Sequence, residues 1–388
     1  MGKILAICTS PRRGTVKTAV PSAVLTPEWG IVGDAHGGNW HRQVSMLSAE
    51  KIEAFRKKVW VDYGAFGENL VVEGFDFRTL PVTSRFAIGD VVLEMTQIGK
   101  ECHNDCVIKQ QTGECIMPRE GVFARVIAGG EIRVGDEVTL LPPPENPPLR
   151  AAVITLSDKG SRGEREDKSG PLIVKMLAAA GYKVEETLLL PDEAAALKAQ
   201  LIRLADGRQV NLILTTGGTG FSPRDITPEA TLAVADRIGV MNHGRIEQIA
   251  DPQTLYRRPG TEYVATFIGL TNRLPGIANG EEAVVFGQRV PLLDGSATDA
   301  STVLVRPENM TIELTDDADA VHGAGELGRV EMVHFLGALA RVDVRVACAG
   351  MGGTIRVTVQ LPANELPAGL AIGAQVVVAP RPIPALAV

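Results

Sequence analysis

Three loops of the middle segment carry residues suited to phosphate chemistry. They contain Ser157-Asp158, Pro191-Asp192-Glu193 and the glycine-rich run Gly217-Gly-Thr-Gly220. Glycines let backbone N–H groups approach a phosphate closely, and carboxylates such as Asp192 hold Mg²⁺ against phosphate oxygens. The loops therefore predict a site for a phosphorylated ligand. A second interpretation stays open, in which the glycine run is a turn and Asp158 and Asp192 cap helices.

The glycine-rich loop continues into Phe221-Ser-Pro-Arg-Asp-Ile-Thr-Pro228. Pro228 suits the first turn of a helix, and a helix N-terminus favours negative charge. Asp225 in this loop is placed to share a Mg²⁺ ion with Asp192. Arg224 is placed to neutralise the charge that develops during group transfer.

The elements around these loops alternate between short apolar runs and helical patterns. Strands are predicted at Ala151–Ser157, Lys183–Leu190 and Val210–Thr216, and helices at Lys168–Ala180 and Glu193–Asp206. This βαβαβ order predicts a parallel sheet with right-handed crossovers. Loops that follow parallel strands meet at one edge of the sheet, where ligands bind.

The middle segment, residues 150–237, resembles the MoaB/Mog molybdopterin-binding family. The resemblance rests on Thr215–Thr231, Ser157–Gly163 and Glu166–Gly170. It implies a nucleotidyltransferase that moves AMP from ATP to molybdopterin with Mg²⁺ and releases pyrophosphate. It implies that Asp192 and Asp225 are the catalytic and metal-binding residues. The binding residues of the predicted site are Ser157, Asp158, Gly217, Gly218, Thr219, Gly220, Ser222, Arg224 and Thr227.

The first segment contains a cysteine cluster, Gly99-Lys-Glu-Cys-His-Asn-Asp-Cys106 followed by Cys115. A thiolate stores or transfers sulfur best when nearby cations lower its pKa, and Lys100, His103 and Arg119 are its sequence neighbours. Zinc binding by three cysteines and His103 is the alternative, although the spacing departs from the usual short pairs. For Cys8 and Cys348 we expect a buried, inert role.

Residues 1–141 resemble the MOSC family, a β-barrel. The resemblance rests on Gly30–Gly38, Phe66–Leu70 and Ala128–Asp136. It implies a sulfur carrier that holds a persulfide on Cys102 and exchanges it with a sulfur donor or a molybdoenzyme partner. Glu101 replaces the proline that often precedes the reactive cysteine in this family. His36 and His41 are candidates to line the same pocket, and one helix is predicted over Ser48–Lys58.

A proline-rich spacer, residues 142–149, separates these two segments. Its prolines exclude helix and favour extended polyproline geometry, which makes a semi-rigid linker. The predicted domains are therefore residues 1–141, 150–237 and 238–388, with residues 142–149 as the linker.

Residues 238–388 resemble the C-terminal tail of an ABC-transporter ATPase, with a TOBE-type, OB-like barrel. The resemblance rests on Ala235–Ile249, Phe267–Asn272 and Val305–Glu308. No Gly-x-x-x-x-Gly-Lys-[Ser/Thr] loop occurs in the sequence, which excludes ATP-driven transport by this chain alone. Ala233–Arg237 fits both families, so the MoaB/Mog-like domain is truncated at the join. A recombination or assembly event and a natural three-domain regulator both account for this junction.

The bulk composition supports a multidomain protein of mixed α/β and β class. With 388 residues, 45% of them hydrophobic and 22% charged, the chain has two or three globular domains. The net charge of −7 and the absence of a basic stripe exclude a nucleic-acid partner. No apolar run is long enough for membrane insertion, so we expect a cytoplasmic protein. The predicted architecture is a MOSC β-barrel, a partial three-layer α/β parallel sheet and an OB-like barrel.

Two functions follow from the sequence. The first is molybdenum cofactor biosynthesis by adenylylation of molybdopterin, with the MOSC domain as sulfur carrier. The alternative is a non-catalytic pterin- or anion-binding fusion in which only the MOSC domain is functional. Relatives of the middle domain form trimers or hexamers, and a homo-oligomer remains open because the truncation removes part of that contact region.

Overall fold

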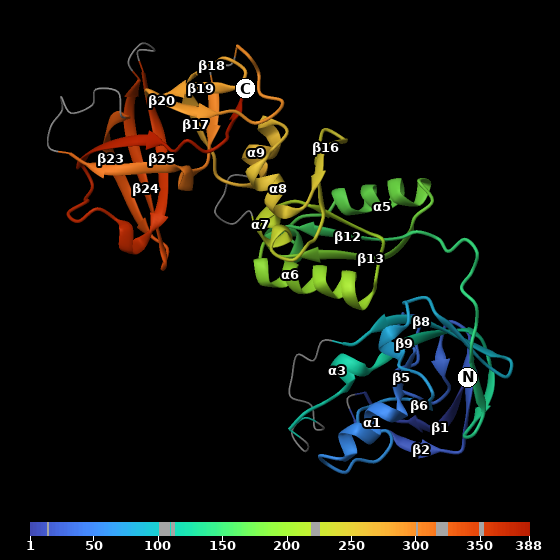
Figure 1. The fold of residues 1–388 in the computed structure, drawn as a ribbon. Coiled ribbons are helices and arrows are strands. Elements are labelled where there is room, and N and C mark those ends of the chain that lie inside the picture. The colour runs from blue at the N-terminus through green and yellow to red at the C-terminus, as the bar shows by residue number, and fades with distance from the viewer. Residues whose placement is uncertain are drawn as a thin grey trace. The chain divides into compact units, whose positions relative to one another are not determined.

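The chain folds into two compact units, described here one at a time. The computed structural model describes residues 1–13, 15–100, 109, 113–218, 226–299, 302–315, 325–348 and 353–388. One unit contains Met1–Pro191 and Ala199–Thr216, and the other contains Asp192–Lys198 and Gly217–Val388. Figure 1 shows the elements of both units with their labels.

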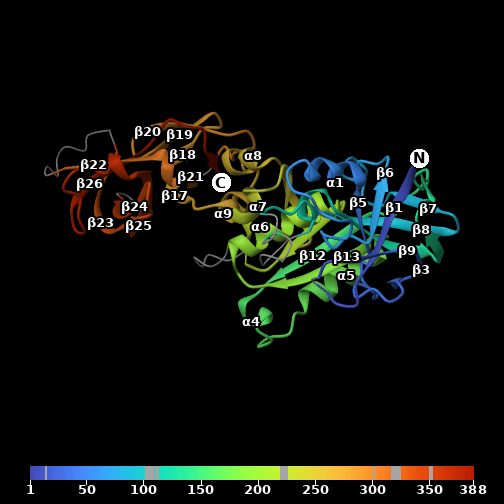
Figure 2. The same ribbon diagram turned by 90° about the horizontal axis from the view of Figure 1, so that it is seen from below.

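The first unit begins with a closed β-barrel. Seven strands follow one another around the ring, and β11 pairs with β1 to close it. Figure 2 shows β7, β8 and β9 side by side in this barrel. In ring order the strands are β11 (Glu137–Leu140), β7 (Arg85–Ile88), β8 (Val91–Ile98), β9 (Val122–Ala128), β5 (Val44–Ser48), β6 (Leu70–Glu73) and β1 (Gly2–Thr9). The inward side chains are branched aliphatics and phenylalanines, such as Ile4, Leu93 and Phe86, and they are fully buried. Burial of this apolar area is the main force that holds the ring together.

Smaller elements complete the barrel. The strand β2 (Thr18–Val20) pairs with β1, and β10 (Gly130–Arg133), β3 (Ser22–Thr26) and β4 (Gly30–Ile31) form a separate three-stranded sheet. The helical pieces are α1 (Ala49–Arg56), η1 (Phe77–Thr79) and α3 (Met117–Glu120). The predicted helix over Ser48–Lys58 is thus confirmed. Ser48 stands at its N-cap, but the Ser48 hydroxyl donates to Glu50 Oε2 at 2.6 Å rather than capping a backbone N–H.

The same unit contains a three-stranded parallel sheet in the order β13-β12-β14. Its strands are β12 (Arg150–Leu156), β13 (Lys183–Leu190) and β14 (Leu212–Thr216). The helix α5 (Ser169–Ala179) packs Ile173, Val174 and Leu177 on this sheet. The remaining helical segments in this stretch of the chain are α4 (Asp158–Ser161), the π-helical turn η2 (Arg203–Gly207) and α6 (Ala194–Ile202), of which residues 199–202 belong to this unit. The predicted βαβαβ order and parallel pairing are confirmed.

The second unit opens with short helices around a hairpin. These elements are α7 (Thr227–Leu232), β15 (Ile238–Asn242), β16 (Arg245–Ala250), α8 (Pro252–Arg257) and α9 (Glu262–Ile268). Val240, Leu255, Val264 and Ile268 form their apolar core. Asp251 and Thr261 cap α8 and α9 by accepting hydrogen bonds from backbone N–H groups, which satisfies donors that a helix leaves free at its start.

The rest of the second unit is rich in strands. The largest sheet has the order β22-β26-β23-β24-β25, and its inward valines build a shared core with the two smaller sheets. The strands are β17 (Asn272–Pro275), β18 (Ile277–Ala278), β19 (Glu282–Val285), β20 (Gln288–Pro291), β21 (Thr302–Val305), β22 (Met310–Leu314), β23 (Glu326–Phe335), β24 (Leu339–Cys348), β25 (Gly353–Pro362), β26 (Gln375–Pro380) and β27 (Leu386–Ala387), with η3 (Pro307–Asn309) and η4 (Ala363–Glu365) between them. Barrel, α/β sheet and strand-rich region confirm the predicted mixed class.

Arg306 fastens the helical part of the second unit to its strands. Its Nη1 donates to the carbonyl oxygens of Ala265 and Gly269 at 2.8 Å each, and its guanidinium lies 4.2 Å from the ring centre of Tyr256. The residue is 7% exposed. Arg306 therefore satisfies carbonyl groups that the C-terminal end of α9 leaves free.

None of the helices within the described ranges has the length and apolar character needed to span a bilayer.

Candidate functional site

The carboxyl ends of the three parallel strands lie together at one edge of the sheet. Leu156 of β12 pairs with Leu190 of β13, and Thr155 pairs with Thr216 of β14. Ser157 follows β12 directly, Asp192 follows β13 after one residue, and Gly217 follows β14 directly. The register thus brings the starting points of the three predicted loops to the same edge.

Ser157 has a local structural role at this edge. Its Oγ accepts a hydrogen bond from the N–H of Gly160 at 3.1 Å and so caps α4, in whose first turn Asp158 lies. The backbone N–H of Ser157 donates to the carbonyl of Leu190 at 2.9 Å. The loop after β12 is therefore held against the end of β13, and the cap of α4 is Ser157 rather than Asp158, for which the sequence had suggested that role.

The glycine-rich loop is fixed where it begins and where it ends. Gly217 and Gly218 have φ angles of +85° and +58°, in the left-handed region that favours glycine. Thr227, which is 3% exposed, donates from Oγ1 to the carbonyl of Gly217 at 2.9 Å and from its N–H to the carbonyl of Gly218 at 3.2 Å. Pro228 follows in the first turn of α7, as predicted. Thr227 thus holds the two ends of the loop against each other.

Several predicted site residues fall outside the part of the chain that the structure describes. They are Cys102, Thr219, Gly220, Ser222, Arg224 and Asp225. The shared Mg²⁺ ion of Asp192 and Asp225, the thiol chemistry of Cys102 and zinc binding by Cys106 and His103 stay predictions. Among the described residues, no group of three or more His, Cys, Asp or Glu side chains is arranged to hold a metal ion.

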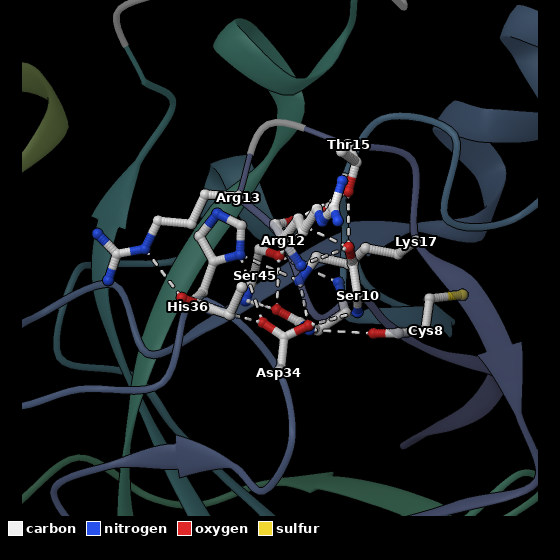
Figure 3. A network of polar contacts seen from close by, with 12 residues as sticks. Cys8, Ser10, Arg12, Arg13, Thr15, Lys17, Asp34, His36 and Ser45 are labelled. Atoms are coloured by element: carbon white, nitrogen blue, oxygen red, sulfur yellow. Dashed lines mark hydrogen bonds and ion pairs between the residues drawn. The ribbon is translucent and has the colours of Figure 1, made fainter.

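A second set of polar side chains gathers in the loops that join β1 to β2 and β4 to β5, and Figure 3 shows Arg13, Lys17, Asp34 and His36 of this set. We call Arg13, Lys17, Asp34, His36, Trp40 and Arg42 the barrel cluster. Lys17 Nζ lies 2.5 Å from Asp34 Oδ2, and both side chains are fully buried. The Asp34 carboxylate also accepts from the N–H groups of Ser10 at 3.0 Å and His36 at 2.9 Å. Burial opposes the charge, but the hydrogen bonds from His36 and Lys17 outweigh it and hold the pKa of Asp34 below its usual range.

Aromatic and cationic groups surround the ring of Trp40. The guanidinium carbons of Arg13 and Arg42 lie 5.2 and 5.0 Å from its centre, within cation–π range. The rings of His36 and His41 also contact it, with centre distances of 6.5 and 6.2 Å. Trp40 Nε1 donates to the His36 carbonyl at 2.7 Å, which fixes the indole plane.

His41 differs from His36 in its surroundings. Its Nε2 lies 2.9 Å from Gln97 Oε1, and burial lowers the pKa of His41 to about 4. The His41 ring is therefore neutral at pH 7.

Cys8, whose charge interacts with Lys17 of the barrel cluster, is unsuited to thiolate chemistry. It is fully buried, and burial together with the nearby Glu68 carboxyl raises the pKa of its thiol to about 12. Burial also raises the pKa of Glu68 to about 7, although its carboxyl accepts from the N–H groups of Gly64 and Phe66. The expected inert role of Cys8 fits these surroundings, whereas the side chain of Cys348 lies outside the described residues.

Comparison with known families divides the chain in the same order as the elements above. Residues 33–139 match the MOSC domain, residues 152–290 match the probable molybdopterin binding domain, and residues 303–387 match the TOBE domain. The molybdopterin adenylyltransferase of Pyrococcus furiosus is 37% identical over 137 residues, which are 35% of this chain and 73% of that protein. Through its middle segment, the chain belongs to the molybdopterin adenylyltransferase family.

This molybdopterin adenylyltransferase family member covers a smaller share of other curated relatives. The molybdopterin adenylyltransferase of Escherichia coli K12 is 45% identical over 92 residues, 23% of this chain and 47% of the relative. The chain thus spans about half the length of the first curated relatives it matches. Sulfate/thiosulfate import ATP-binding protein CysA 2 of Chromobacterium violaceum is 35% identical over 201 residues, 50% of this chain and 53% of the relative. The three expected resemblances and their order along the chain are confirmed.

One buried polar side chain near the carboxyl edge of the sheet was not indicated by the sequence. Thr155, at the end of β12, is 6% exposed, and its Oγ1 has no hydrogen-bond partner among the described residues. A Cβ at Gly170, in the first turn of α5, would lie 2.8 Å from that Oγ1. The close approach explains the glycine in the motif Lys168-Ser-Gly170. Threonine in a buried strand is common, so the sequence offered no signal for Thr155.

Proposed function

We propose that residues 150–237 catalyse the Mg-ATP-dependent adenylylation of molybdopterin. The observation that carries this proposal is the common edge of β12, β13 and β14, from which the loops with Ser157, Asp192 and Gly217 begin. The relative from Pyrococcus furiosus, whose name states this activity, aligns over most of its length. Molybdenum cofactor biosynthesis is thus the process in which the chain takes part.

In the proposed reaction an oxygen of molybdopterin attacks the α-phosphorus of ATP. The bond from the α-phosphorus to the oxygen bridging to the β-phosphate breaks, and pyrophosphate leaves with that electron pair. The left-handed turns at Gly217 and Gly218 allow backbone N–H groups to face phosphate oxygens. Carboxylates at Asp192 and Asp225 suit Mg²⁺, which would supply neutralisation of the phosphate charge. Arg224 would stabilise the charge that builds up on the reacting phosphate.

The test follows pyrophosphate release by the full-length chain with ATP, Mg²⁺ and molybdopterin. Asp192→Asn and Asp225→Asn should each lower the rate by at least about 100-fold, the size of effect seen when one charge-stabilising group is removed. Asp206→Asn, an exposed carboxylate in η2, is the matched control and should keep the rate. Equal rates in all three variants, or no pyrophosphate from folded wild type, would refute the proposal.

We further propose that the MOSC domain carries sulfur as a persulfide on Cys102. Lys100 and Arg119 supply positive charge near this position in the sequence, which favours a thiolate. Incubation with a persulfide donor should add the mass of one sulfur atom to the peptide that contains Cys102. Cys102→Ser should abolish the added mass, and Cys115→Ser should leave it. Retention of the sulfur in Cys102→Ser would assign it to another cysteine.

A non-catalytic function is the second candidate, and one observation favours it. The parallel sheet has three strands in the described residues, and the chain spans 47% of the Escherichia coli relative. A sheet with an uncovered edge strand is weakly stabilised. In this case the middle domain would bind ATP or molybdopterin without turnover. Equilibrium binding of both ligands without pyrophosphate release would support this candidate over the enzyme.

A further inference from the structure

A cavity of about 690 Å³ lies inside the first unit, at the amino end of the parallel sheet. Arg150 and Lys183, the first residues of β12 and β13, are paired in register and line it on one side. The barrel lines it on the other side, where the N–H of Val82 donates to Gln209 Oε1 at 2.9 Å. The proposed adenylyl transfer uses the carboxyl ends of the same strands, so the cavity is a separate site. Its volume suits a small molecule.

The charges that line the cavity are unequal in number. They are five cations and three carboxylates, namely Arg85, Arg125, Arg150, Lys183 and Arg208 against Glu28, Glu94 and Glu185. Arg85 and Arg125 each lie 2.8 Å from Glu94 on the barrel side. Glu28, which is 4.0 Å from Arg125, completes a balanced set there. His41 also lines the cavity and adds no charge at pH 7, because burial lowers its pKa to about 4. The surplus of positive charge therefore belongs to the sheet side.

On the sheet side, three cations depend on the carboxylate of Glu185. Lys183 Nζ lies 2.9 Å from its Oε1, and Arg208 Nη2 donates to its Oε2 at 3.0 Å. Arg150 is 8% exposed, and its Nη2 donates to the neutral carbonyl of Gln209 at 2.7 Å. The carboxylate whose charge acts most strongly on Arg150 is again Glu185. An excess of like charge in a partly enclosed cavity is unfavourable unless an anion balances it.

Arg208 also has buried donors without an acceptor. The residue is 1% exposed, and its Nε and Nη1 have no hydrogen-bond partner in the part of the chain that the structure describes. Glu186, whose charge also acts on Arg208, is paired with Arg203 at 2.6 Å. Buried polar groups normally have a partner, because an unpaired donor has lost its hydrogen bonds to water. The unpaired donors and the surplus of charge thus indicate the same kind of ligand, an anion with oxygen acceptors.

We propose that this cavity binds a small phosphate dianion beside Arg150 and Arg208. The two negative charges of a phosphate group match the surplus of two positive charges, and guanidinium groups suit phosphate oxygens. The ligand is either inorganic phosphate or a phosphate monoester whose organic part fills the rest of the cavity. For such a part the lining offers Trp40 and four prolines, Pro81, Pro144, Pro147 and Pro148. The site goes beyond the proposed adenylyl transfer, because it uses none of the residues of that reaction.

Trp40 lines the cavity and reports whether it is occupied. Trp29 and Trp60 are 51% and 73% exposed and lie outside the lining, so both are replaced by phenylalanine in the full-length chain. This chain is titrated at a pH of about 8, where a phosphate group carries nearly two charges. The ligands are inorganic phosphate, phenyl phosphate and benzoate, and chloride keeps the ionic strength constant.

We expect a saturable change in Trp40 fluorescence with both phosphate compounds. Benzoate should bind at least about 10-fold more weakly than phenyl phosphate, because it has one negative charge instead of two. Tighter binding of phenyl phosphate than of inorganic phosphate identifies a monoester. Equal or weaker binding of phenyl phosphate identifies the free ion.

Variants of the sheet side should change the affinity in opposite directions. Arg150→Met and Arg208→Met should each weaken phosphate binding by about 10-fold or more, the effect of one hydrogen bond to a charged group. Glu185→Gln keeps an acceptor oxygen for Lys183 and Arg208 but removes the competing negative charge, so it should tighten binding by about 3-fold or more. If these residues had only a structural role, all three variants would weaken binding.

Arg13→Met is the matched control. The guanidinium of Arg13 lies 5.2 Å from the ring centre of Trp40 but does not line the cavity, so this variant should keep the affinity. The proposal is overturned if the folded chain gives no saturable signal, or if benzoate binds as tightly as phenyl phosphate. It is also overturned if Arg150→Met binds phosphate as tightly as Arg13→Met does, or if Glu185→Gln weakens binding.

Discussion

Replacement of Asp34 by asparagine tests whether the buried ion pair with Lys17 holds the barrel together. The two charged atoms are 2.5 Å apart, and neither side chain is exposed to solvent. Asparagine keeps the shape and one acceptor oxygen but removes the negative charge. Loss of one partner leaves a buried charge without compensation, which costs about 3–5 kcal/mol. We expect the free energy of unfolding of the barrel to fall by this amount at pH 7.

The pH dependence of the variant gives a second, independent readout. Burial already lowers the pKa of Lys17, and removal of Asp34 takes away a contact that opposes this shift. The unfolded chain then binds more protons than the folded one, so the stability of Asp34→Asn should rise with pH. The loss relative to wild type should therefore shrink as the pH is raised from 7 toward 10.

The assay is urea unfolding followed by Trp40 fluorescence in the chain without Trp29 and Trp60. The control is Glu131→Gln, which removes the partner of the exposed Arg133 and should leave the unfolding midpoint unchanged. The variant Lys17→Met with Asp34→Asn should recover much of the lost stability, because no buried charge is left. A loss below about 1 kcal/mol in Asp34→Asn would refute the reasoning, because surface pairs have that value.

Three further perturbations address other parts of the chain. The pKa of Glu68 rises from 4.5 to about 7 on folding, so the folded state keeps this proton to a higher pH than the unfolded chain does. The free energy of unfolding of the barrel should therefore fall by about 3 kcal/mol as the pH rises from 4.5 to 7. Urea midpoints across this range should fall in wild type and change less in Glu68→Gln. Gly217→Ala forces a Cβ into a φ of +85°, which costs about 1–2 kcal/mol, and pyrophosphate release should drop while the barrel unfolds at an unchanged midpoint. Arg306→Met removes the guanidinium donor from the carbonyls of Ala265 and Gly269, which keep only a longer hydrogen bond from Thr271 Oγ1, and should lower the thermal midpoint of the C-terminal unit, whereas the exposed Arg289→Met should not.

The parallel sheet was predictable because its signals are local. Each strand is a short apolar run that ends at a polar or glycine-rich loop, and Lys183–Leu190 was predicted with the bounds that the structure has. The second helix was predicted over Glu193–Asp206, but α6 ends at Ile202 and a π-helical turn follows. Arg203 in that turn forms an ion pair with Glu186 of β13, a tertiary contact that no helix pattern records.

The barrel cluster was only partly predictable because its members come from distant parts of the chain. The motif Gly33-Asp-Ala-His36 indicated His36 as a candidate. Its partner Lys17 is a single lysine in a stretch without any motif, so the sequence did not indicate it. Lys17 reaches Asp34 because β2 folds back on β1, with Cys8 opposite Ala19, and this register depends on the whole barrel. For the carboxyl edge, the positions of Ser157 and Gly217 follow from strand order alone, whereas the capping role of Ser157 appears only in the coordinates.

Closure of the barrel has a consequence for the order in which the domain folds. Gly2 and Lys3 of β1 pair with Val138 and Glu137 of β11, so the last hydrogen bonds of the ring join strands from opposite ends of the domain. Contacts between residues far apart in sequence slow folding, because a long loop must close first. During synthesis the N-terminal part of one edge of β1 therefore stays unpaired until β11 has emerged, whereas β2 pairs with the rest of that edge, and an unpaired edge recruits other strands. We expect this interval, rather than the stability of the finished ring, to determine how much of the protein is lost to aggregation.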